Sequence, residues 1–185
     1  MENRKVENYV DMALYYARMD AVYKDYMIAE TNLQEVAQQV LLQNKYYLIQ
    51  SHVKAEVACP DTVYSDKKWI AFILNQLIQN SVKYGRSEGT HIQIVTKKTK
   101  SGVLLRVKDD GIGIPKEEIP RIFEKGFTGT NGRNRERSTG MGLYLCRKLC
   151  DKLNIEIRAE SAEGKGTEII LMFPVSDYLT GYRET

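Results

Sequence analysis

The chain has 185 residues, of which 27 are Lys or Arg and 24 are Asp or Glu, so its formal net charge is +3. That balance does not favour a nucleic-acid-binding or membrane-surface protein. A content of 43% hydrophobic and 28% charged residues excludes disordered and fibrous classes. No apolar run reaches the roughly 18 residues of a membrane helix, and the polar residues after Met1 predict no signal peptide. Three cysteines fit a reducing cytoplasm.

The N-terminal residues predict an amphipathic helix, because apolar side chains recur at helical spacing at Val6, Val10, Ala13, Leu14 and Ala17. An isolated helix of this length is only marginally stable, so we expect it to pack on a partner such as another chain. The residues that follow, Tyr23–Ala29, are compatible with a short strand.

Two core helices are predicted in the first half of the chain, which contains no glycine before Gly85. Asn32, with Glu35 three residues later, resembles a capping box that opens a helix over Leu33–Ile49. Val53–Cys59 alternates like a strand and stops before a proline. Ser65 or Asp66 caps the second helix. The buried stripe of that helix consists of Ile70, Ile73, Leu74, Leu77, Ile78 and Val82.

The second half predicts a hairpin, a helix and a final strand pair: His91–Lys98, Val103–Asp109, Thr139–Leu153, Ile155–Ala159 and Thr167–Phe173. Helices on one face of a mixed, mostly antiparallel sheet give a two-layer α/β sandwich of the α+β class. The N-terminal amphipathic helix is an addition to this sandwich.

The end of the second core helix carries Gln76, Asn80, Lys83 and Tyr84 on one face, because these residues are three or four positions apart. An amide oxygen, a cation and an aromatic ring in a row suit Mg²⁺, a phosphate and a purine respectively. A solvated polar helix face explains the same pattern, so this segment alone leaves both interpretations open.

Asp109, Gly111 and Gly113 follow directly after a predicted strand. A carboxylate at a strand end can accept a hydrogen bond from an exocyclic amine, and glycines let the backbone approach a flat ligand. Asp-Gly is also a common turn.

Phe123 and Phe127 precede a basic, glycine-rich stretch at 128–138 that contains almost nothing apolar. Such a segment can close over phosphates, or it can be an exposed loop anchored by the two phenylalanines.

Gly140, Met141, Gly142 and Leu143 run into a helix, whose N-terminal amides and dipole favour an anion. The spacing matches neither the Walker phosphate loop nor the dinucleotide-binding fingerprint.

Together, and in this order, these segments resemble the GHKL (Bergerat-fold) ATP-binding domain, specifically the catalytic domain of sensor histidine kinases. Gly164, Gly166 and Thr167 resemble its closing turn, and the resemblance covers about residues 31–175. The amino-acid sequences of Gln76–Tyr84 and Arg137–Tyr144 are most similar to those of the short-sensor kinases of Gram-positive bacteria, which are linked to antimicrobial-peptide efflux transporters.

The resemblance implies ATP and Mg²⁺ as cofactors. Asn80 would ligate Mg²⁺, Lys83 would contact phosphate, Tyr84 would flank the adenine and Asp109 would bind its amino group. The stretch 128–138 would be the ATP lid. The full set of implied binding residues is Gln76, Asn80, Lys83, Tyr84, Asp109, Gly111, Gly113, Phe127, Gly140, Met141, Gly142, Leu143 and Thr167.

Two residues depart from the family pattern. Ser138 stands where the glycine box often opens with Gly, and Gln76 stands where many members have Asn. ATP-hydrolysing relatives have a Glu at the latter position as general base, and an amide cannot accept that proton. A kinase is therefore favoured over an ATPase. A regulatory ATP-binding module without kinase activity stays open, and anti-sigma serine kinases would not need the N-terminal helix.

The resemblance further implies three parts: 1–22 as the second helix of a dimerisation and phosphotransfer hairpin, 23–177 as the ATP-binding domain, and 178–185 as a tail. No phosphoacceptor motif surrounds His52 or His91, so the acceptor and its base are expected on a helix outside this sequence. Implied partners are a response regulator, the homodimer's own helices and a peptide-transporter membrane protein, with no nucleic acid. The implied location is the cytoplasmic side of a plasma-membrane protein. Cys146 and Cys150 are expected to pack in the core.

Overall fold

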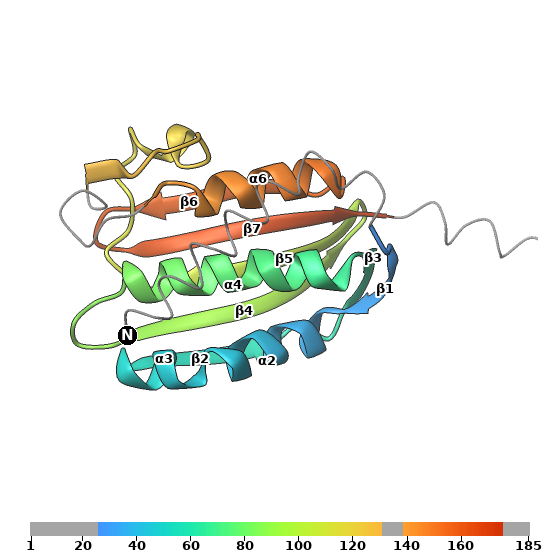
Figure 1. Ribbon diagram of the computed structural model, residues 1–185, viewed down its shortest axis with the longest axis horizontal. Coiled ribbons are helices and arrows are strands. Elements are labelled where there is room, and N and C mark those ends of the chain that lie inside the picture. Colours follow the sequence, from blue (N-terminus) through green and yellow to red (C-terminus); the bar gives the residue numbers. More distant parts are fainter. Residues whose placement is uncertain (1–25, 131–138, 176–185) are drawn as a thin grey trace, which may run out of the picture.

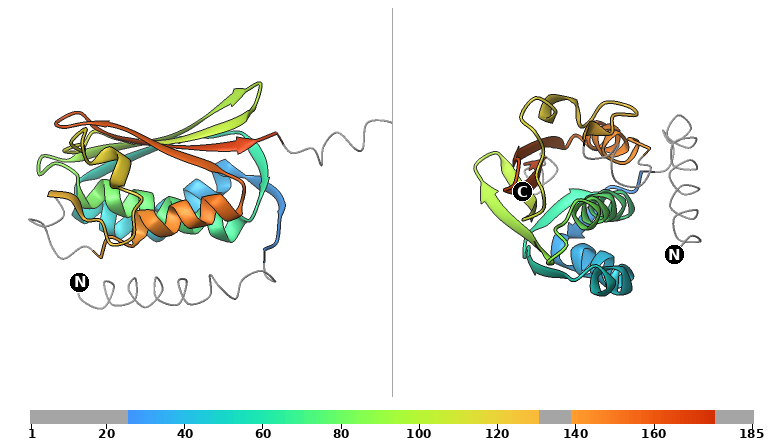
Figure 2. Two further views of the ribbon diagram at one scale, coloured as in Figure 1. Left: turned by 90° about the horizontal axis from the view of Figure 1, so that it is seen from above. Right: turned by 90° about the vertical axis from the view of Figure 1, so that its left-hand side faces the viewer.

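The computed structural model describes residues 26–130 and 139–175, which form a sheet with a layer of helices on one of its faces (Figure 1 and Figure 2). The helices are α2 (Leu33–Gln43), α3 (Lys45–Gln50), α4 (Lys67–Lys83) and α6 (Gly142–Lys152), with a short 3₁₀ turn η2 at Ile119–Arg121. Within the described ranges, no helix combines the length and the apolar character needed to cross a membrane.

The main sheet contains β2 (Val53–Ala58), β4 (Thr90–Thr99), β5 (Gly102–Asp109), β6 (Glu156–Ala162) and β7 (Gly166–Pro174). Its strand order is β2-β4-β5-β7-β6, in which β2 runs parallel to β4 and the other neighbours are antiparallel. A separate pair joins β1 (Ala29–Asn32) to β3 (Thr62–Ser65) in antiparallel register. The predicted two-layer α+β sandwich is confirmed.

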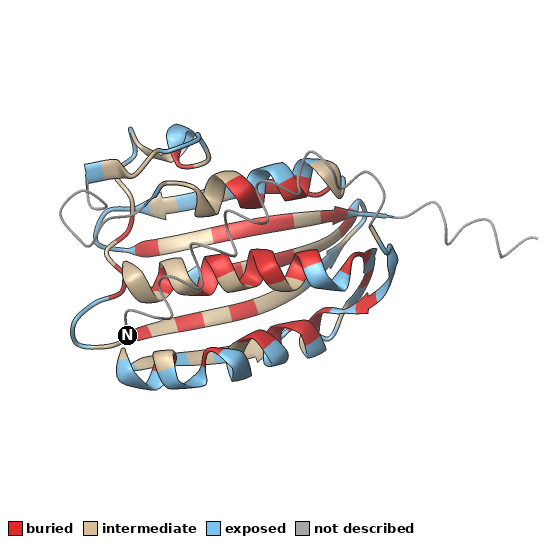
Figure 3. Ribbon diagram, in the orientation of Figure 1, coloured by how far each residue is buried: buried red, intermediate tan, exposed pale blue. Residues whose placement is uncertain are grey.

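Helix α4 is the centre of the core, because it packs between α2 and α6 and against the sheet (Figure 2). Its predicted apolar stripe is almost fully buried, except Val82, which is partly buried. Figure 3 shows this burial as red bands on α4 and at alternate positions of β4. Ile92 and Ile94 of β4 are both fully buried. Burying each such side chain contributes about 1.5–3 kcal/mol. The C-terminal end of α4 is therefore held firmly beside the loop that follows β5.

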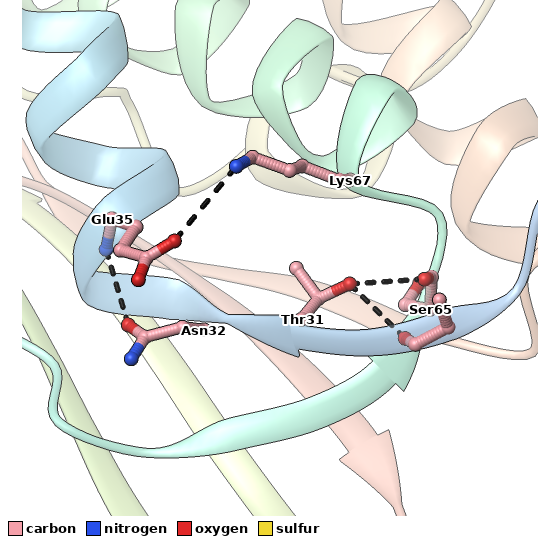
Figure 4. Close-up of polar contacts among 6 residues, drawn as sticks. Thr31, Asn32, Glu35, Ser65 and Lys67 are labelled. Carbon is pink, nitrogen blue, oxygen red and sulfur yellow. Dashed lines mark hydrogen bonds and ion pairs between the residues drawn. The ribbon is translucent and has the colours of Figure 1, made fainter.

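The predicted cap of the first helix is confirmed, since Asn32 Oδ1 accepts a hydrogen bond from Glu35 N at 3.1 Å (Figure 4). The carboxylate of Glu35 lies 3.8 Å from Lys67 Nζ, so it ties the start of α2 to the start of α4. Beside it, Thr31 Oγ1 donates to Ser65 O at 3.1 Å and links β1 to β3. These contacts fix the N-terminal ends of the two helices.

The predicted single helix over Leu33–Ile49 is wrong, because α2 ends at Gln43 and α3 begins at Lys45. Asn44 separates them. Its buried amide nitrogen donates to Val40 O at 2.9 Å and to Asn75 Oδ1 of α4 at 2.8 Å. A side chain that bonds to the local backbone in this way favours helix ends over helix interiors.

The predicted strand at Tyr23–Ala29 is also wrong within the described residues, because β1 starts only at Ala29. Its partner β3 was not predicted at all, since the pairing depends on contacts between distant segments. The remaining predicted strands and helices are found within a few residues of their expected ends. The predicted helix through Val6–Ala17 and the stretch 131–138 lie outside the described residues.

Asp66 is the cap of α4 and also holds the chain that enters β1. Its Oδ1 accepts from Lys68 N and Trp69 N at 2.9 and 3.2 Å, and its Oδ2 accepts from Met27 N at 2.9 Å. We predict that Asp66→Ala lowers the free energy of unfolding by about 2 kcal/mol in urea denaturation. Asp66→Asn keeps an acceptor for the helix amides and should cost less than half as much. Equal stability of Asp66→Ala and wild type would contradict this role.

Candidate functional site

A cavity of about 110 Å³ opens between the C-terminal half of α4, the ends of β5 and β7, and the segment 113–129. Seven of the predicted binding residues line it: Asn80, Tyr84, Asp109, Gly113, Phe127, Leu143 and Thr167. The structure thus brings together residues from five separate sequence segments. The cavity is the candidate nucleotide site.

Asp109 is a buried carboxylate in the wall of this cavity, since the residue is only 9% exposed. Its Oδ1 accepts hydrogen bonds from Gly111 N at 3.0 Å and Thr167 N at 3.2 Å. Its Oδ2 accepts from the hydroxyl of Ser81 at 2.8 Å. An ionised carboxylate offers about four acceptor positions. Three are therefore used by the protein, and one on Oδ2 is left for a donor on a ligand.

The pKa of Asp109 is raised above the usual carboxyl value, chiefly because burial disfavours the charged form. The three hydrogen bonds from Ser81, Gly111 and Thr167 oppose that shift by stabilising the carboxylate, while the neighbouring charge of Asp110 adds to it. The site therefore keeps a desolvated acceptor, which binds a donor more strongly than a solvated one would.

Most of the cavity wall is apolar and suits a flat aromatic ligand. The apolar part of the wall consists of Leu77, Val107, Ile114, Ile122, Phe127, Leu143 and Ile169. Phe127 is also covered by Arg121, whose guanidinium carbon lies 4.6 Å from the ring centroid. The other predicted phenylalanine, Phe123, packs against the core instead of lining the cavity.

The first glycine run is required largely by the protein's own backbone. A Cβ on Gly113, which has φ of +73°, would collide with the carbonyl oxygen of Ala162. A Cβ on Gly111 would lie 2.5 Å from Tyr84 O. Of the two, only Gly113 also lines the cavity. The close approach of these glycines to a flat ligand stays a prediction, and the neighbours that the structure gives them are the end of β6 for Gly113 and the end of α4 for Gly111.

The second glycine segment, Gly140 to Leu143, packs beside the cavity, and only Leu143 lines it. Gly140 has φ of +63°, and a Cβ there would collide with the backbone of Gly126, whose N–H donates to Gly140 O. Helix α6 then begins at Gly142 with Met141 as its N-cap. These close contacts fix where the N-terminus of α6 lies.

Gln76 and Lys83 lie outside the cavity wall. Gln76 is 8% exposed, and its Oε1 lies so close to Gly142 that a Cβ there would be 2.8 Å away. It therefore packs α4 against the start of α6. Lys83 Nζ lies 5.6 Å from the ring centroid of Tyr84.

Four further members of the wall were not among the predicted binding residues: Ser81, Glu118, Thr128 and Gly129. Thr128 and Gly129 belong to the stretch 128–138 that was predicted as a lid, so the composition of that stretch already indicated that they lie near the ligand site. Ser81 and Glu118 had no such signal, because their partners are distant in sequence.

A metal would need oxygen ligands here, and the amide oxygen of Asn80 in the cavity wall is of the type that Mg²⁺ accepts. Among the described residues, no cluster of three or more His, Cys, Asp or Glu side chains could hold a metal. Cys146 and Cys150 are buried, and burial raises the pKa of the Cys150 thiol to about 12. Their predicted core packing is confirmed.

Fold and cavity together define a Bergerat-type ATP-binding sandwich. A comparison with known protein families agrees with this fold assignment. Residues 65–177 match the family described as histidine kinase-, DNA gyrase B- and HSP90-like ATPase. The chain belongs to this family.

Curated relatives of the chain include sensor histidine kinases. YxdK of Bacillus subtilis is 34% identical over 174 residues, which cover 93% of this chain and 54% of the relative. GraS of Staphylococcus aureus is 35% identical over 178 residues, 94% of this chain and 50% of the relative. The chain therefore spans about half the length of these proteins and is homologous to their ATP-binding catalytic region.

Solved structures of the histidine kinase ThkA share the fold. Its nucleotide-free catalytic domain aligns with a TM-score of 0.69 and 24% identity over 80% of this chain and 95% of that chain. Its complex with the response regulator protein TrrA aligns with a TM-score of 0.70 and 23% identity over 96% of this chain and 49% of that chain.

The environment of Asp109 predicts a specific pH dependence. The pKa of Asp109 is higher in the folded state than in the unfolded chain, so the folded state holds its proton more tightly. The resulting contribution to the free energy of unfolding is present at low pH. It is lost as the pH rises from the ordinary carboxyl range through the folded-state pKa. Asp109→Asn can keep all three protein contacts, with its amide nitrogen donating to Ser81. We predict that the variant gains stability relative to wild type as the pH rises above the ordinary carboxyl range of about pH 4, measured by urea unfolding. A difference that does not change with pH would contradict this account.

Proposed function

We propose that this chain is the ATP- and Mg²⁺-dependent catalytic domain of a two-component sensor histidine kinase. It transfers the γ-phosphate to a histidine on a helix outside this sequence, for relay to a response regulator. One observation carries the proposal: a buried carboxylate, Asp109, keeps a single free acceptor position inside an apolar cavity beside Asn80. A nucleobase with an exocyclic amine offers a donor for the free acceptor position and flat faces for the apolar wall.

The proposed roles follow from where each residue lies. Asp109 accepts from the adenine amino group, and Tyr84 flanks the ring. Asn80, one turn earlier on α4, presents its amide oxygen to the Mg²⁺ bound with ATP, where Lys83 also meets phosphate. Positioning and charge neutralisation are most of what phosphoryl transfer needs from a protein.

The N-terminus of α6 is the proposed phosphate site. Gly140, Met141 and Gly142 lead into its first turn, where unpaired amides and the helix dipole attract anions. Gln76 supports this arrangement indirectly, because it packs against Gly142 and so helps to hold the first turn in place.

Kinase activity is favoured over ATP hydrolysis because the two carboxylates in the cavity wall, Asp109 and Glu118, already have protein partners. Asp109 is occupied by three protein donors, and Glu118 Oε1 accepts two hydrogen bonds from Thr130. Gln76 cannot act as a base. In this proposal Asp109 is thus assigned to the base of the nucleotide and Glu118 to Thr130, and position 76 offers no carboxylate to activate an attacking water.

The proposed organisation places residues 1–22 in the second helix of a dimerisation hairpin, 23–177 in the catalytic domain and 178–185 in a tail. The full protein is then a homodimer with its catalytic domain on the cytoplasmic side of the membrane. ThkA, which shares the fold, has been solved with a response regulator, which supports a partner of that type. A peptide-transporter membrane protein is proposed as a further partner, on the resemblance to short-sensor kinases.

The nucleotide role predicts ATP–Mg²⁺ binding that depends on Asp109. Asp109→Asn replaces the free acceptor by an amide that can donate, so we expect its dissociation constant, measured by calorimetry, to rise at least about thirtyfold. Asp110→Asn is the matched control, because Asp110 is exposed and adjacent, and should stay within about threefold. A wild-type chain that binds no ATP with Mg²⁺ would rule out the proposed function.

The kinase role predicts phosphotransfer in trans. Radiolabelled ATP and a separately supplied acceptor hairpin should yield a phosphohistidine that is stable to base and labile to acid. Asn80→Ala should lower the rate by about a hundredfold, since Mg²⁺ would lose its protein ligand. ATP binding without any transfer would favour the regulatory module, and steady phosphate release without the hairpin would favour an ATPase.

A further inference from the structure

Glu118 lies in the cavity wall, and its side chain contacts the segment Thr128–Thr130, part of which also lines the cavity. Its Oε1 accepts hydrogen bonds from Thr130 N at 2.8 Å and from Thr130 Oγ1 at 2.6 Å. Two residues immediately before Thr130, Thr128 and Gly129, line the cavity themselves. One side chain thus joins two parts of the wall that are separate in the sequence.

The second oxygen of the same carboxylate sets how closely the two segments pack. Gly129 has φ of +59°, in the left-handed region that glycine adopts without strain. A Cβ at this position would lie only 2.5 Å from Glu118 Oε2. Both oxygens therefore face the 129–130 backbone, and the absence of a side chain at 129 allows that approach.

We propose that Glu118 is a positioning residue for nucleotide binding: it holds Thr130 and thereby fixes the Thr128–Gly129 wall against which the ligand packs. The inference rests on the proposed function of the cavity and adds a residue with no assigned role. Hydrogen bonds to an ionised acceptor are roughly twice as strong as neutral ones, so a single carboxylate suffices to hold this short segment.

The charge and the hydrogen bonds of Glu118 have opposite expected effects on an anionic ligand. A negative side chain in the wall repels phosphates, so removing the charge alone should leave ATP affinity equal or slightly improved. Removing the acceptor should weaken binding, because the wall is no longer held. Two substitutions separate these effects.

Calorimetry with ATP and Mg²⁺ on the full chain tests the proposal. Glu118→Gln keeps an acceptor oxygen and should bind ATP within about twofold of wild type, while Glu118→Ala should bind about tenfold more weakly. Glu117→Ala removes a neighbouring exposed carboxylate and serves as the control. Equal affinities for wild type and Glu118→Ala would overturn the proposal, as would a similar loss in Glu118→Gln and Glu118→Ala.

A double-mutant cycle tests whether Glu118 acts through Thr130. Thr130→Val removes the hydroxyl donor and should weaken ATP binding about threefold in the wild-type background. In the Glu118→Ala background the same change should have no further effect, since the contact is already lost. Additive effects would show that the two residues act independently and would contradict the proposal.

A measurement without nucleotide separates this inference from the proposed function. In Glu118→Ala, hydrogen exchange at the Thr130 amide should accelerate about tenfold, while the midpoint of urea unfolding stays unchanged. Unchanged exchange would overturn the positioning role even if ATP binds. If wild type binds no ATP, the proposed function fails and the nucleotide role of Glu118 fails with it, whereas faster exchange would still establish that Glu118 holds the wall.

Discussion

The buried carboxylate of Asp109 is the constraint on which the site depends. A desolvated charge is costly unless it is hydrogen-bonded, and its three protein donors come from three different elements: Ser81 of α4, Gly111 after β5, and Thr167 of β7. Satisfying this one side chain therefore fixes the helix layer relative to the sheet at the end where the cavity opens. The same geometry leaves one acceptor position on Oδ2, so the residue that joins the layers is also the one that we propose to meet a ligand.

The loops around Asp109 pack backbone against backbone, and this keeps the carboxylate in place. Gly166 has φ of +88°, and a Cβ there would collide with Asp109 O. Arg86 donates to Asp110 O and to Gly164 O, which joins the loop after α4 to the turn between β6 and β7. A site supported by such contacts is preorganised before the ligand arrives.

Periodicity predicted α4, α6 and the main strands because their apolar residues face a single core, whereas β1 and β3 escaped prediction because each depends on the other. Asp109 and Asn80 were predicted from motif spacing and do line the cavity. Gln76 shares the spacing of Asn80 yet packs against α6. Ser81 and Glu118 were missed because their partners, Asp109 and Thr130, are 28 and 12 positions away. Contacts of that range are set by the fold.

The central claim is that the free acceptor on Asp109 recognises an exocyclic amine. The most direct measurement compares, by calorimetry with Mg²⁺, the affinities of ATP and of purine riboside 5′-triphosphate, which lacks only that amine. The account predicts that wild type binds ATP at least about tenfold more tightly, the effect of one hydrogen bond to a buried charge. It also predicts that Asp109→Asn abolishes this preference. Equal affinities of the two nucleotides for wild type would contradict the account.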